Sequence, residues 1–343
     1  KQEKPVYVRA LAPVRISFGG GGSDLTHFFT NSRGAVINAA ITMYCHATLR
    51  IRDDEQIQIY SLDLEDELKA ESLEQALQSQ GQFGLVLEIL RLVNPDYGFD
   101  LYLNSDFKIG SGLGGSASVA VAILACFNHL RRDQWDRYEL AELAFQAERI
   151  YLGVAGGWQD QYAAVFGGAN FIEFDKDQHI VNPIRMDDVT IMELQESLVL
   201  CDTGILHDSG NIHVAQKKSM ESTDTTEQVK KNVELVFDIK NHLLRGKTHL
   251  LGKDLHKAWQ LKRSFSEEIS TPEIDSIYQG ALKNGANGGK LLGAGGGGYF
   301  LFHVSPFNKN RLSKYLNEIG LTTRPVFFDP QGCRSWSLRQ PSE

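Results

Sequence analysis

The stretch of sequence that decides the fold reads, in order, Gly110-Ser111-Gly112-Leu113-Gly114-Gly115-Ser116-Ala117-Ser118. Directly after it, residues 119–123 form the apolar, helix-forming run Val-Ala-Val-Ala-Ile. Glycine lets backbone N–H groups approach a ligand closely. The first turn of a helix adds free amides and the positive end of the helix dipole. The change from glycine loop to helix therefore predicts a polyphosphate site built from residues 110–118.

Two hydroxyl residues stand at this helix start, and each suits two roles. Ser116 and Ser118 fit the N-cap position, where a side-chain oxygen accepts a backbone N–H and adds roughly 1 kcal/mol. Either hydroxyl also fits a contact with a phosphate or with its Mg²⁺ ion. The two roles are compatible, one for each serine, and the sequence leaves the assignment open.

The loop differs from the two commonest nucleotide loops. A Walker A loop requires a lysine directly before its serine or threonine, whereas Gly115 precedes Ser116 here. Residues 110–115 do have the G-x-G-x-x-G spacing of a dinucleotide fingerprint. However, the acidic residue expected about 20 positions further on falls in a helical stretch, near Asp133 and Asp136. The sequence therefore disfavours both readings.

Two further glycine runs, Gly19–Gly22 and Gly293–Gly298, flank the central loop at long distance. Each of them alone is typical of a tight turn. Apolar patterns predict strands over residues 6–18, 35–52, 56–60, 99–103, 169–174, 197–202 and 325–328, and a strand pair within 290–304. They predict helices over residues 83–92, 116–130, 138–152, 272–285 and 308–319, and over 219–265 with a break near Gly246.

The composition is that of a globular protein with a sizeable core. The chain has 343 residues, of which 42% are hydrophobic and 23% charged. No apolar stretch reaches the roughly 18 residues of a membrane span, and residues 1–5 are not followed by the apolar run of a secretory signal. These features predict a cytoplasmic protein of two domains, with a boundary near residue 190.

The net charge of −8, from 35 basic and 43 acidic residues, is not that of a nucleic-acid-binding protein. The negative charge of any bound phosphate must therefore be balanced locally by backbone amides, a few cations and a metal. Four cysteines lack metal-ligand spacing and are predicted to be buried and reduced: Cys45, Cys126, Cys201 and Cys333. His207 and His213, with Asp208 between them, also lack metal spacing, and residues 203–213 suit a substrate-side loop better.

Three segments together resemble the motifs of the GHMP kinases. They are residues 12–25, which contain RISFGGGGSD, residues 110–120, and residues 290–298, which read KLLGAGGGG. Their order and wide separation also match, so the resemblance covers nearly the whole chain. The RISFGGGGSD opening and the WQDQY segment at 158–162 are most similar to the D-glycero-D-manno-heptose 7-phosphate kinases, with the fucose kinases as near relatives.

The resemblance implies a two-domain α+β fold with the active site between the domains. Residues 1–190 would form a ribosomal-S5-like α/β domain that carries the phosphate loop, and residues 191–343 a ferredoxin-like domain. It implies ATP on residues 110–118 and Mg²⁺ on Ser116 and Glu148. Without the resemblance, Glu148 reads as an exposed helical glutamate.

The same resemblance implies catalytic roles for Asp160 and Arg15. Asp160 would lie beside the acceptor hydroxyl, either as a general base or as a group that orients it. Arg15 would place a fixed positive charge near the transferred phosphoryl group. The ordinary alternatives are an aspartate that complements a helix dipole and an arginine in a structural ion pair.

Substrate contacts are implied for both outer glycine runs, namely by Gly20, Gly21, Gly22, Ser23, Asp24, Gly295 and Gly296. A plain turn is the alternative for the first run. A sugar that carries a phosphate also requires cations, and the candidates are Arg33, Lys108, Lys217, Lys218 and Lys290.

The expected activity is ATP-dependent phosphorylation of a sugar, with the anomeric hydroxyl of D-glycero-D-manno-heptose 7-phosphate as the implied acceptor. Two alternatives stay open: a kinase of a neutral sugar such as fucose or galactose, and a non-catalytic protein that senses a sugar or nucleotide. The expected partners are ATP and the sugar or sugar phosphate, with no nucleic acid and no membrane, and a homo-oligomer is left open.

Overall fold

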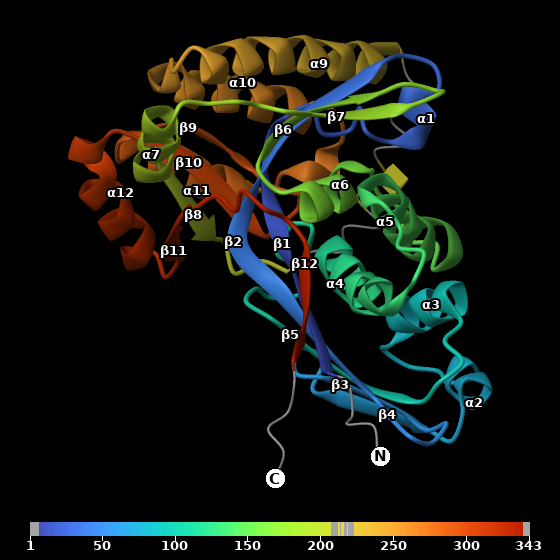
Figure 1. The fold of residues 1–343 in the computed structure, drawn as a ribbon. Coiled ribbons are helices and arrows are strands. Elements are labelled where there is room, and N and C mark those ends of the chain that lie inside the picture. Colours follow the sequence, from blue (N-terminus) through green and yellow to red (C-terminus); the bar gives the residue numbers. More distant parts are fainter. Residues whose placement is uncertain (1–6, 207–211, 213, 216–217, 219–222, 339–343) are drawn as a thin grey trace.

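The computed structural model describes residues 7–206, 212, 214–215, 218 and 223–338. Among these residues the chain forms one eight-stranded sheet and one four-stranded sheet, each with helices packed against it (Figure 1). The predicted mixture of helices and strands is thereby confirmed. His207, Asp208, His213 and Lys217 lie outside the described residues.

The large sheet is built around two long antiparallel strands, β1 (Tyr7–Gly19) and β2 (Gly34–Ile51). The first half of β2 pairs with β6 (Ala169–Phe174), and its second half pairs with β5 (Phe99–Ser105). The strand order is β12-β1-β2-β5-β3-β4, with β6 beside β2 and β7 beside β6. The remaining strands are β3 (Ile57–Ser61), β4 (Asp66–Ala70), β7 (His179–Pro183) and β12 (Arg334–Leu338).

Helices cover one face of this sheet (Figure 1). They are α3 (Gly84–Val93), α4 (Gly115–Leu130), α5 (Arg137–Phe145), the π-helical turn η1 (Gln146–Tyr151) and α6 (Gln159–Phe166). All residues from 120 to 127 of α4 are buried, and α4 packs on both β1 and β2. A helix that is apolar on every side must be enclosed. Its central position fixes the place of the glycine loop that precedes it.

The small sheet has the antiparallel order β11-β8-β10-β9. Its strands are β8 (Leu198–Asp202), β9 (Ala286–Leu291), β10 (Tyr299–Val304) and β11 (Thr322–Pro325). Three helices pack on it: α10 (Leu251–Arg263), α11 (Pro272–Lys283) and α12 (Pro306–Glu318). A further helix, α9 (Thr223–Leu244), packs on α10 and on β1 and β2 of the large sheet. The third glycine run is the turn between β9 and β10, as predicted.

The predicted strand over residues 325–328 is wrong. β11 ends at Pro325, and Phe328 instead forms an isolated bridge with Ile41 of β2. Proline lacks the N–H that a continuing ladder would need. The elements that the sequence did not predict include α1 (Thr26–Phe29), α2 (Leu73–Leu77), α7 (Asp188–Ser197), β4, β7 and β12. All of them are short and most are largely exposed, so their apolar periodicity is weak.

The final strand crosses between the two halves of the sequence. β12 pairs antiparallel with β1, from Leu11 opposite Arg334 to Tyr7 opposite Leu338. Residues 191–343 therefore contribute one strand to the large sheet, and the predicted boundary near residue 190 falls inside α7. Long-range pairing of this kind leaves no mark in local periodicity.

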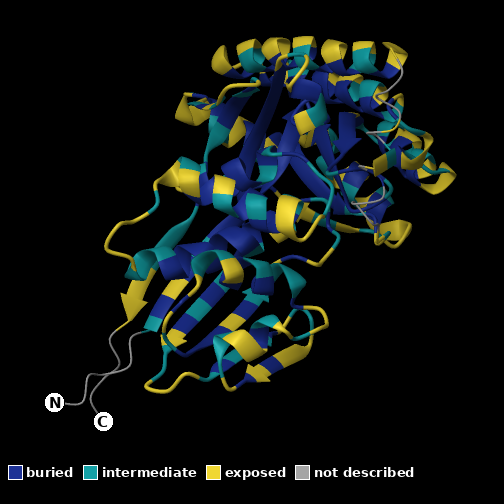
Figure 2. Cartoon of the chain, turned by 90° about the vertical axis from the view of Figure 1, so that its right-hand side faces the viewer, coloured by how far each residue is buried: buried dark blue, intermediate teal, exposed yellow. Residues whose placement is uncertain are grey.

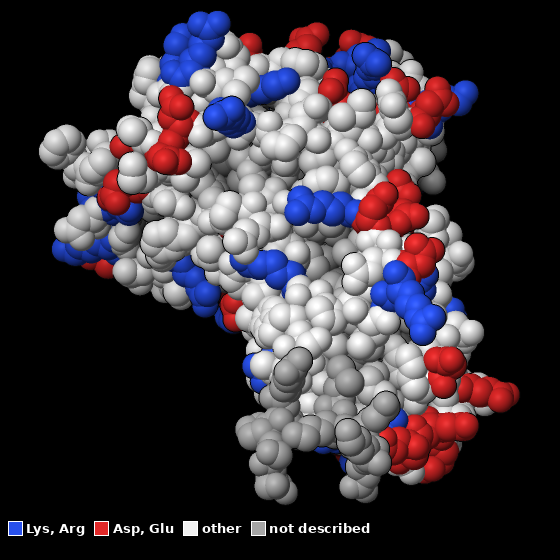
Figure 3. All heavy atoms as spheres, in the orientation of Figure 1, with Lys and Arg blue, Asp and Glu red and all other residues white. Residues whose placement is uncertain are grey.

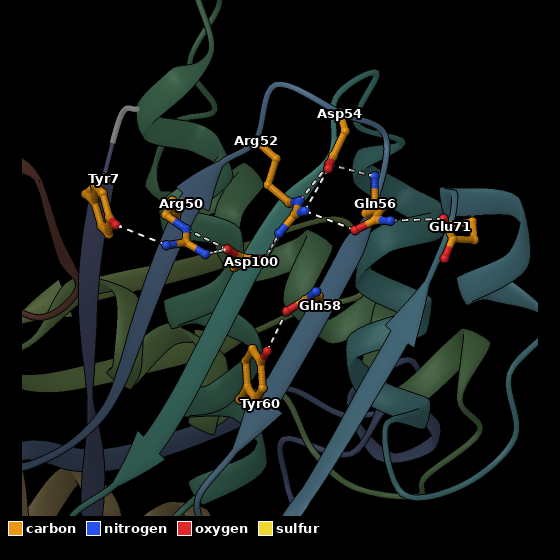
Figure 4. A network of polar contacts seen from close by, with 9 residues as sticks. All are labelled: Tyr7, Arg50, Arg52, Asp54, Gln56, Gln58, Tyr60, Glu71 and Asp100. Carbon is orange, nitrogen blue, oxygen red and sulfur yellow. Dashed lines mark hydrogen bonds and ion pairs between the residues drawn. The ribbon is translucent and has the colours of Figure 1, made fainter. Parts of the chain in front are cut away.

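A polar network links neighbouring strands of the large sheet (Figure 4). Asp100 of β5 accepts hydrogen bonds from Arg50 Nε of β2 at 2.5 Å and from Nη1 of Arg52, the residue directly after β2, at 3.0 Å. Arg52 also pairs with Asp54 at 2.6 Å. Along these strands buried and exposed residues alternate (Figure 2), as in a sheet with one face toward solvent. The network reinforces the register of β2 against β5.

Candidate active site

A cavity of about 570 Å³ lies where the three glycine runs come together. Its apolar lining comes from the large-sheet half of the protein and includes Leu64, Leu85, Val86, Leu103 and Phe107. Its polar lining includes the phosphate loop, Arg15, Asp24, Glu148, Asp160 and Lys262. The cavity thus suits both a flat apolar group and charged groups.

The second and third glycine runs are in direct contact. The backbone N–H of Tyr299 donates to the carbonyl of Ser111 at 3.1 Å. At Gly293, where φ is +74, an added Cβ would lie 2.6 Å from the Cα of Gly112. Only glycine allows so close a backbone approach together with a positive φ. The β9–β10 turn of the small sheet therefore supports the phosphate loop of the large one.

Most of the predicted phosphate-loop residues line the cavity, namely Gly110, Ser111, Gly112, Gly114, Gly115 and Ser116. Leu113 and Ala117 are instead fully buried. Ser118 is also fully buried, and its hydroxyl donates to the carbonyl of Ala12 on β1 at 2.5 Å. The structure makes Ser118 a link between α4 and the sheet, so its predicted ligand role is wrong.

The N-cap reading is wrong for both serines. The N-cap of α4 is Gly114, which has φ +77, and no side chain among the described residues bonds to this helix start. Glycine at this position keeps the first amides of α4 accessible from the cavity. An exposed helix N-terminus of this kind favours an anion.

Arg15 and Asp160, predicted as the catalytic pair, form an ion pair with 2.8 Å between Nε and Oδ1. Arg15 lies on β1, is 4% exposed, and donates from Nη1 to the carbonyl of Gly112 at 2.9 Å. Asp160 lies in the first turn of α6, so close to Gly114 that an added Cβ there would be 3.0 Å from its Cγ. The pair therefore sits against the phosphate loop.

Glu148 lies in η1, so the predicted helix over 138–152 exists but changes to π-helical winding in its last part. Such π-turns are frequent at functional sites. Glu148 is 2% exposed, which rules out the surface reading. Its Oε1 accepts the Ser116 hydroxyl, and its Oε2 accepts the Gln161 amide at 2.9 Å. Arg149 Nη1 lies 3.4 Å from Oε1.

These residues fit a bound Mg²⁺ ion. Burial raises the pKa of Glu148 above its ordinary value, against the opposing effect of Arg149, and a divalent cation would favour the ionised form. Mg²⁺ uses one or two protein oxygens and completes its shell with phosphates and water. Glu148 and Ser116 offer two adjoining oxygens at the cavity wall. Among the described residues, no three His, Cys, Asp or Glu side chains form a metal cluster of their own.

Asp24 faces the cavity together with Gly21 and Gly22. Its Oδ1 accepts the N–H of Gly22 at 3.1 Å, and its Oδ2 accepts the N–H of Gln159 at 3.2 Å. Burial and the nearby charge of Asp160 raise the pKa of Asp24. Each carboxylate oxygen still has a free lone pair, so Asp24 can accept hydrogen bonds from sugar hydroxyls, and its predicted role in substrate binding stays a prediction.

Ser23 and Gly20, also predicted to touch substrate, are structural. Ser23 is fully buried; its hydroxyl donates to the carbonyl of Gly20 at 2.7 Å and accepts the N–H of Ala35 at 3.1 Å. Gly20 has φ +90, and an added Cβ would lie 2.1 Å from the Ala35 carbonyl. Both residues fasten the first glycine run to β2 rather than line the cavity.

The third run reaches the cavity two residues earlier than predicted. Gly293 and Ala294 line it. Gly296 donates its N–H to the carbonyl of Ile269 at 2.8 Å, and a Cβ at Gly295 would lie 2.9 Å from the Cα of Ile269. The predicted substrate contacts of Gly295 and Gly296 are therefore replaced by packing within the small-sheet half.

None of the described cations predicted to bind a sugar phosphate lines this cavity. The side chains of Arg33 and Lys108 are 79% and 76% exposed. Lys218 lines a second, more open pocket. Lys290 is 3% exposed, and its Nζ donates to Ser17 Oγ at 3.4 Å.

Sequence reasoning missed two cations of the site, Arg149 and Lys262. Arg149 donates from Nη1 to the carbonyl of Ala155 at 3.0 Å and adjoins Glu148. Lys262 is 7% exposed and lies on the buried stripe of α10. A lysine on the apolar face of an amphipathic helix was the signal that could have revealed it.

Other predictions concern the surface and the cysteines. On the face shown in Figure 3, basic and acidic side chains are interspersed. No helix in the described ranges is both long and apolar enough to cross a membrane. Cys45, Cys126 and Cys201 are buried free thiols as predicted, whereas Cys333 is half-buried. Burial raises the pKa of Cys45 to about 12, which keeps it protonated.

Comparisons with known proteins agree with this site. The chain matches the GHMP kinases N terminal domain over residues 84–168 and the GHMP kinases C terminal domain over residues 240–319. A D-glycero-alpha-D-manno-heptose 7-phosphate kinase of Campylobacter jejuni is 34% identical over 337 residues, which cover 96% of this chain and 99% of that protein. An L-fucokinase/L-fucose-1-P guanylyltransferase of Bacteroides fragilis is 26% identical, over 93% of this chain and 37% of that protein.

Solved structures extend the comparison to the whole fold. A D-glycero-D-manno-heptose 1-phosphate kinase of Bacteroides thetaiotaomicron superposes with a TM-score of 0.81 at 29% identity, over 97% of this chain and all of that one. Fold, site and similarity place the chain among the enzymes that transfer a phosphoryl group from ATP to an alcohol. Within that class the chain belongs to the GHMP kinase family and is a sugar kinase. The predicted two-domain α+β fold is thereby confirmed.

Proposed function

We propose that the chain transfers the γ-phosphoryl group of ATP to the anomeric hydroxyl of D-glycero-D-manno-heptose 7-phosphate, giving the 1,7-bisphosphate. The observation that carries this proposal is the 34% identity, over nearly the full length of both chains, to a kinase named for that acceptor. The Bacteroides thetaiotaomicron structure is named for a heptose 1-phosphate. Both names describe a heptose that already carries one phosphate, which supports a sugar monophosphate as the acceptor.

The polar lining of the cavity suits in-line phosphoryl transfer. In the proposed step the anomeric oxygen forms a bond to the γ-phosphorus, and the bond from that phosphorus to the bridging oxygen breaks, so that ADP leaves. The hydroxyl proton passes to the carboxylate of Asp160. Arg15, 2.8 Å from Asp160, supplies fixed positive charge beside the transferred group. The amides of residues 110–116 receive the remaining phosphates.

Ser116 and Glu148 are the residues that would hold Mg²⁺ with the nucleotide. When bound, the ion neutralises part of the negative charge on the β- and γ-phosphates. Glu148 is fixed for this task because Gln161 holds its second oxygen at 2.9 Å. The apolar lining, which includes Leu85, Val86 and Phe107, suits the nucleotide base.

The test is an ADP-release assay with ATP, Mg²⁺ and a panel of acceptors. We expect kcat/KM for heptose 7-phosphate to exceed that for the unphosphorylated heptose by about 10²-fold or more, the scale of a charge-assisted contact pair. The preference should shrink as salt rises where the phosphate stays in contact with solvent. Phosphorus NMR of the product should show a new anomeric phosphate.

Three other results would contradict the proposal in different ways. Equal use of both heptoses would remove the sugar-phosphate assignment and leave the kinase. Best turnover of fucose or galactose would favour the neutral-sugar alternative, for which the 26% identity to an L-fucokinase is the supporting observation. A failure to release ADP with any of the sugars would favour a sensing role.

A further inference from the structure

Lys262 is the one lysine in the lining of the cavity, among the residues that the structure describes. It lies near the end of α10 and is 7% exposed. Leu255, Ala258 and Trp259, on the same stripe of the helix, are buried in the core. An apolar residue would be the ordinary occupant of such a position, because a buried ammonium is costly unless it has partners. The charge at this position therefore calls for a function.

The partners that Lys262 does have are backbone carbonyls. Its Nζ donates to the carbonyl of Gly293 and, at 3.4 Å, to that of Leu291. Within the described part of the chain, no carboxylate lies within ion-pair distance of this ammonium. The carbonyl bonds fix its position, but they do not neutralise its charge.

The two arginines of the cavity differ from Lys262 in this respect. Arg15 forms an ion pair with the carboxylate of Asp160 at 2.8 Å, and Arg149 forms one with the carboxylate of Glu148 at 3.4 Å. Lys262 is thus the cation of the cavity whose countercharge is not supplied by a described side chain. A buried, oriented cation of this kind is the signature of a site for an anion.

A chain of contacts connects Lys262 to Arg15 and Asp160, the proposed catalytic pair. These residues define the corner of the cavity in which the proposed transfer would occur. Gly293, which accepts from Lys262, packs directly on Gly112. The carbonyl of Gly112 accepts from Arg15, and Arg15 pairs with Asp160. Arg15 comes from the large sheet and Lys262 from the helix that packs on the small one. The two cations therefore approach the same corner from opposite halves of the protein.

The electrostatics agree with this placement. Burial, followed by the nearby charge of Arg15, lowers the pKa of Lys262 to about 7, while Asp24 and Asp160 oppose the shift. Lys290, on β9, is also buried, and burial together with Lys262 lowers its pKa well below the ordinary value. An anion beside Lys262 would reverse the loss of its proton.

We propose that Lys262 contacts the phosphoryl group during its transfer, as a second cation on the side opposite Arg15. It keeps its proton throughout and acts through charge. The bond from the acceptor oxygen to phosphorus forms, the bond to the bridging oxygen of ADP breaks, and the acceptor proton goes to Asp160. This role rests on the kinase reaction and is independent of which sugar is the acceptor.

The first experiment compares Lys262→Met with Lys290→Met. Methionine preserves the length and apolar character of the stem in both variants. Lys262→Met should lower kcat by about 10²-fold or more with every acceptor, the scale seen when one preorganised donor to a transition state is removed. Binding of a non-hydrolysable ATP analogue should change little. Lys290→Met, which removes a buried amine outside the cavity lining, should retain most of the activity.

The second experiment uses the pH profile of kcat/KM, which a purely structural role would leave unchanged. For the wild type, kcat/KM should fall as the pH rises through about 7, because Lys262 must be protonated. Lys262→Arg stays charged across this range, so it should retain substantial activity and lose that fall. The arginine variant tests the proposal even where the methionine variant does not fold.

Several results would overturn the proposal. The proposal fails if Lys262→Met has the kcat of the wild type. It also fails if the pH profile of kcat/KM is the same in Lys262→Arg as in the wild type. Equal losses of activity and of thermal stability in both methionine variants would show a structural role. A loss confined to phosphorylated acceptors would show that Lys262 binds the phosphate of the sugar instead. If the wild type prefers a neutral sugar, the heptose proposal fails, and the expected loss in Lys262→Met remains.

Discussion

Arg15 Nε lies 2.8 Å from Asp160 Oδ1, although one residue belongs to a strand and the other to the start of a helix. The same arginine binds the phosphate loop twice: its backbone N–H donates to Leu113 at 3.0 Å, and its Nη1 donates to Gly112 at 2.9 Å. The ion pair and the loop therefore form one rigid unit. Groups fixed before the substrate arrives need not reorganise during the reaction.

Asp160→Asn should lower kcat by about 10²-fold or more, the contribution of a positioned general base. Asparagine has nearly the same shape but does not take up the hydroxyl proton. Binding of ATP should persist, because the loop amides are unchanged. Steady-state kinetics and a separate ATP titration measure the two effects. A smaller loss with an unaltered pH profile would indicate that Asp160 orients the hydroxyl, and activity above about a tenth of wild type would remove it from catalysis.

Gly114→Ala should lower kcat by about 10²-fold, because the new methyl group displaces the Asp160 carboxylate and small misplacements of reacting groups are costly. Its Cβ would lie 3.0 Å from Asp160 Cγ. Gly153→Ala is the matched control: Gly153 has the same φ of +77, with nothing within 4 Å of an added Cβ. Both variants should lose similar stability from the strained backbone. Similar kcat values for the two variants would show that the contact with Asp160 is unimportant.

Glu148→Gln should reduce turnover strongly and weaken its dependence on Mg²⁺. The amide keeps a hydrogen-bond acceptor for Ser116 but loses the negative charge that an ion requires. Turnover measured across a Mg²⁺ titration checks this prediction. Near-normal turnover at saturating Mg²⁺ would mean that Glu148 is not a ligand.

The same variant should be more stable than the wild type at neutral pH without nucleotide or Mg²⁺. Burial raises the folded-state pKa of Glu148 above its ordinary value of 4.5. A carboxyl with a raised pKa favours folding at low pH, and this contribution is lost as the pH rises through the folded-state pKa. The stability gained in Glu148→Gln should therefore be larger at pH about 7 than at pH about 4.5. Urea unfolding at both pH values measures it, and a gain that grows toward acid would contradict the assigned sign.

Ser23→Ala should lower the free energy of unfolding by about 1–3 kcal/mol, because the buried N–H of Ala35 loses its hydroxyl acceptor. The values of KM for ATP and for the sugar should stay unchanged, since Ser23 does not line the cavity. Ser32→Ala, at a half-buried position nearby, is the control and should change stability little. Denaturant unfolding and steady-state kinetics test the two parts. A large rise in the sugar KM of a stable Ser23→Ala protein would restore the substrate role.

Local sequence was sufficient for the parts of the site that depend on local conformation. The glycine loop before α4, the helix that carries Glu148 and the short helix that carries Asp160 were all predicted from residue order and motif. The end of β11 at Pro325 and the strands β4 and β12 were not predicted, because their exposed residues leave little apolar periodicity. Within the motifs, the sequence did not separate the residues that face the cavity from those that support it.

The sequence by itself determined where backbone amides can approach a phosphate and which acidic and basic residues are available, since glycine spacing and residue chemistry are local properties. The tertiary structure decided which of those residues meet. It turned Ser118 toward Ala12 and Ser116 toward Glu148, and it placed Gly293 against Gly112. It also brought Lys262 of α10, which belongs to none of the three motifs, into the cavity lining. Such contacts join residues far apart in the chain, and they are set by packing of the two sheets and their helices.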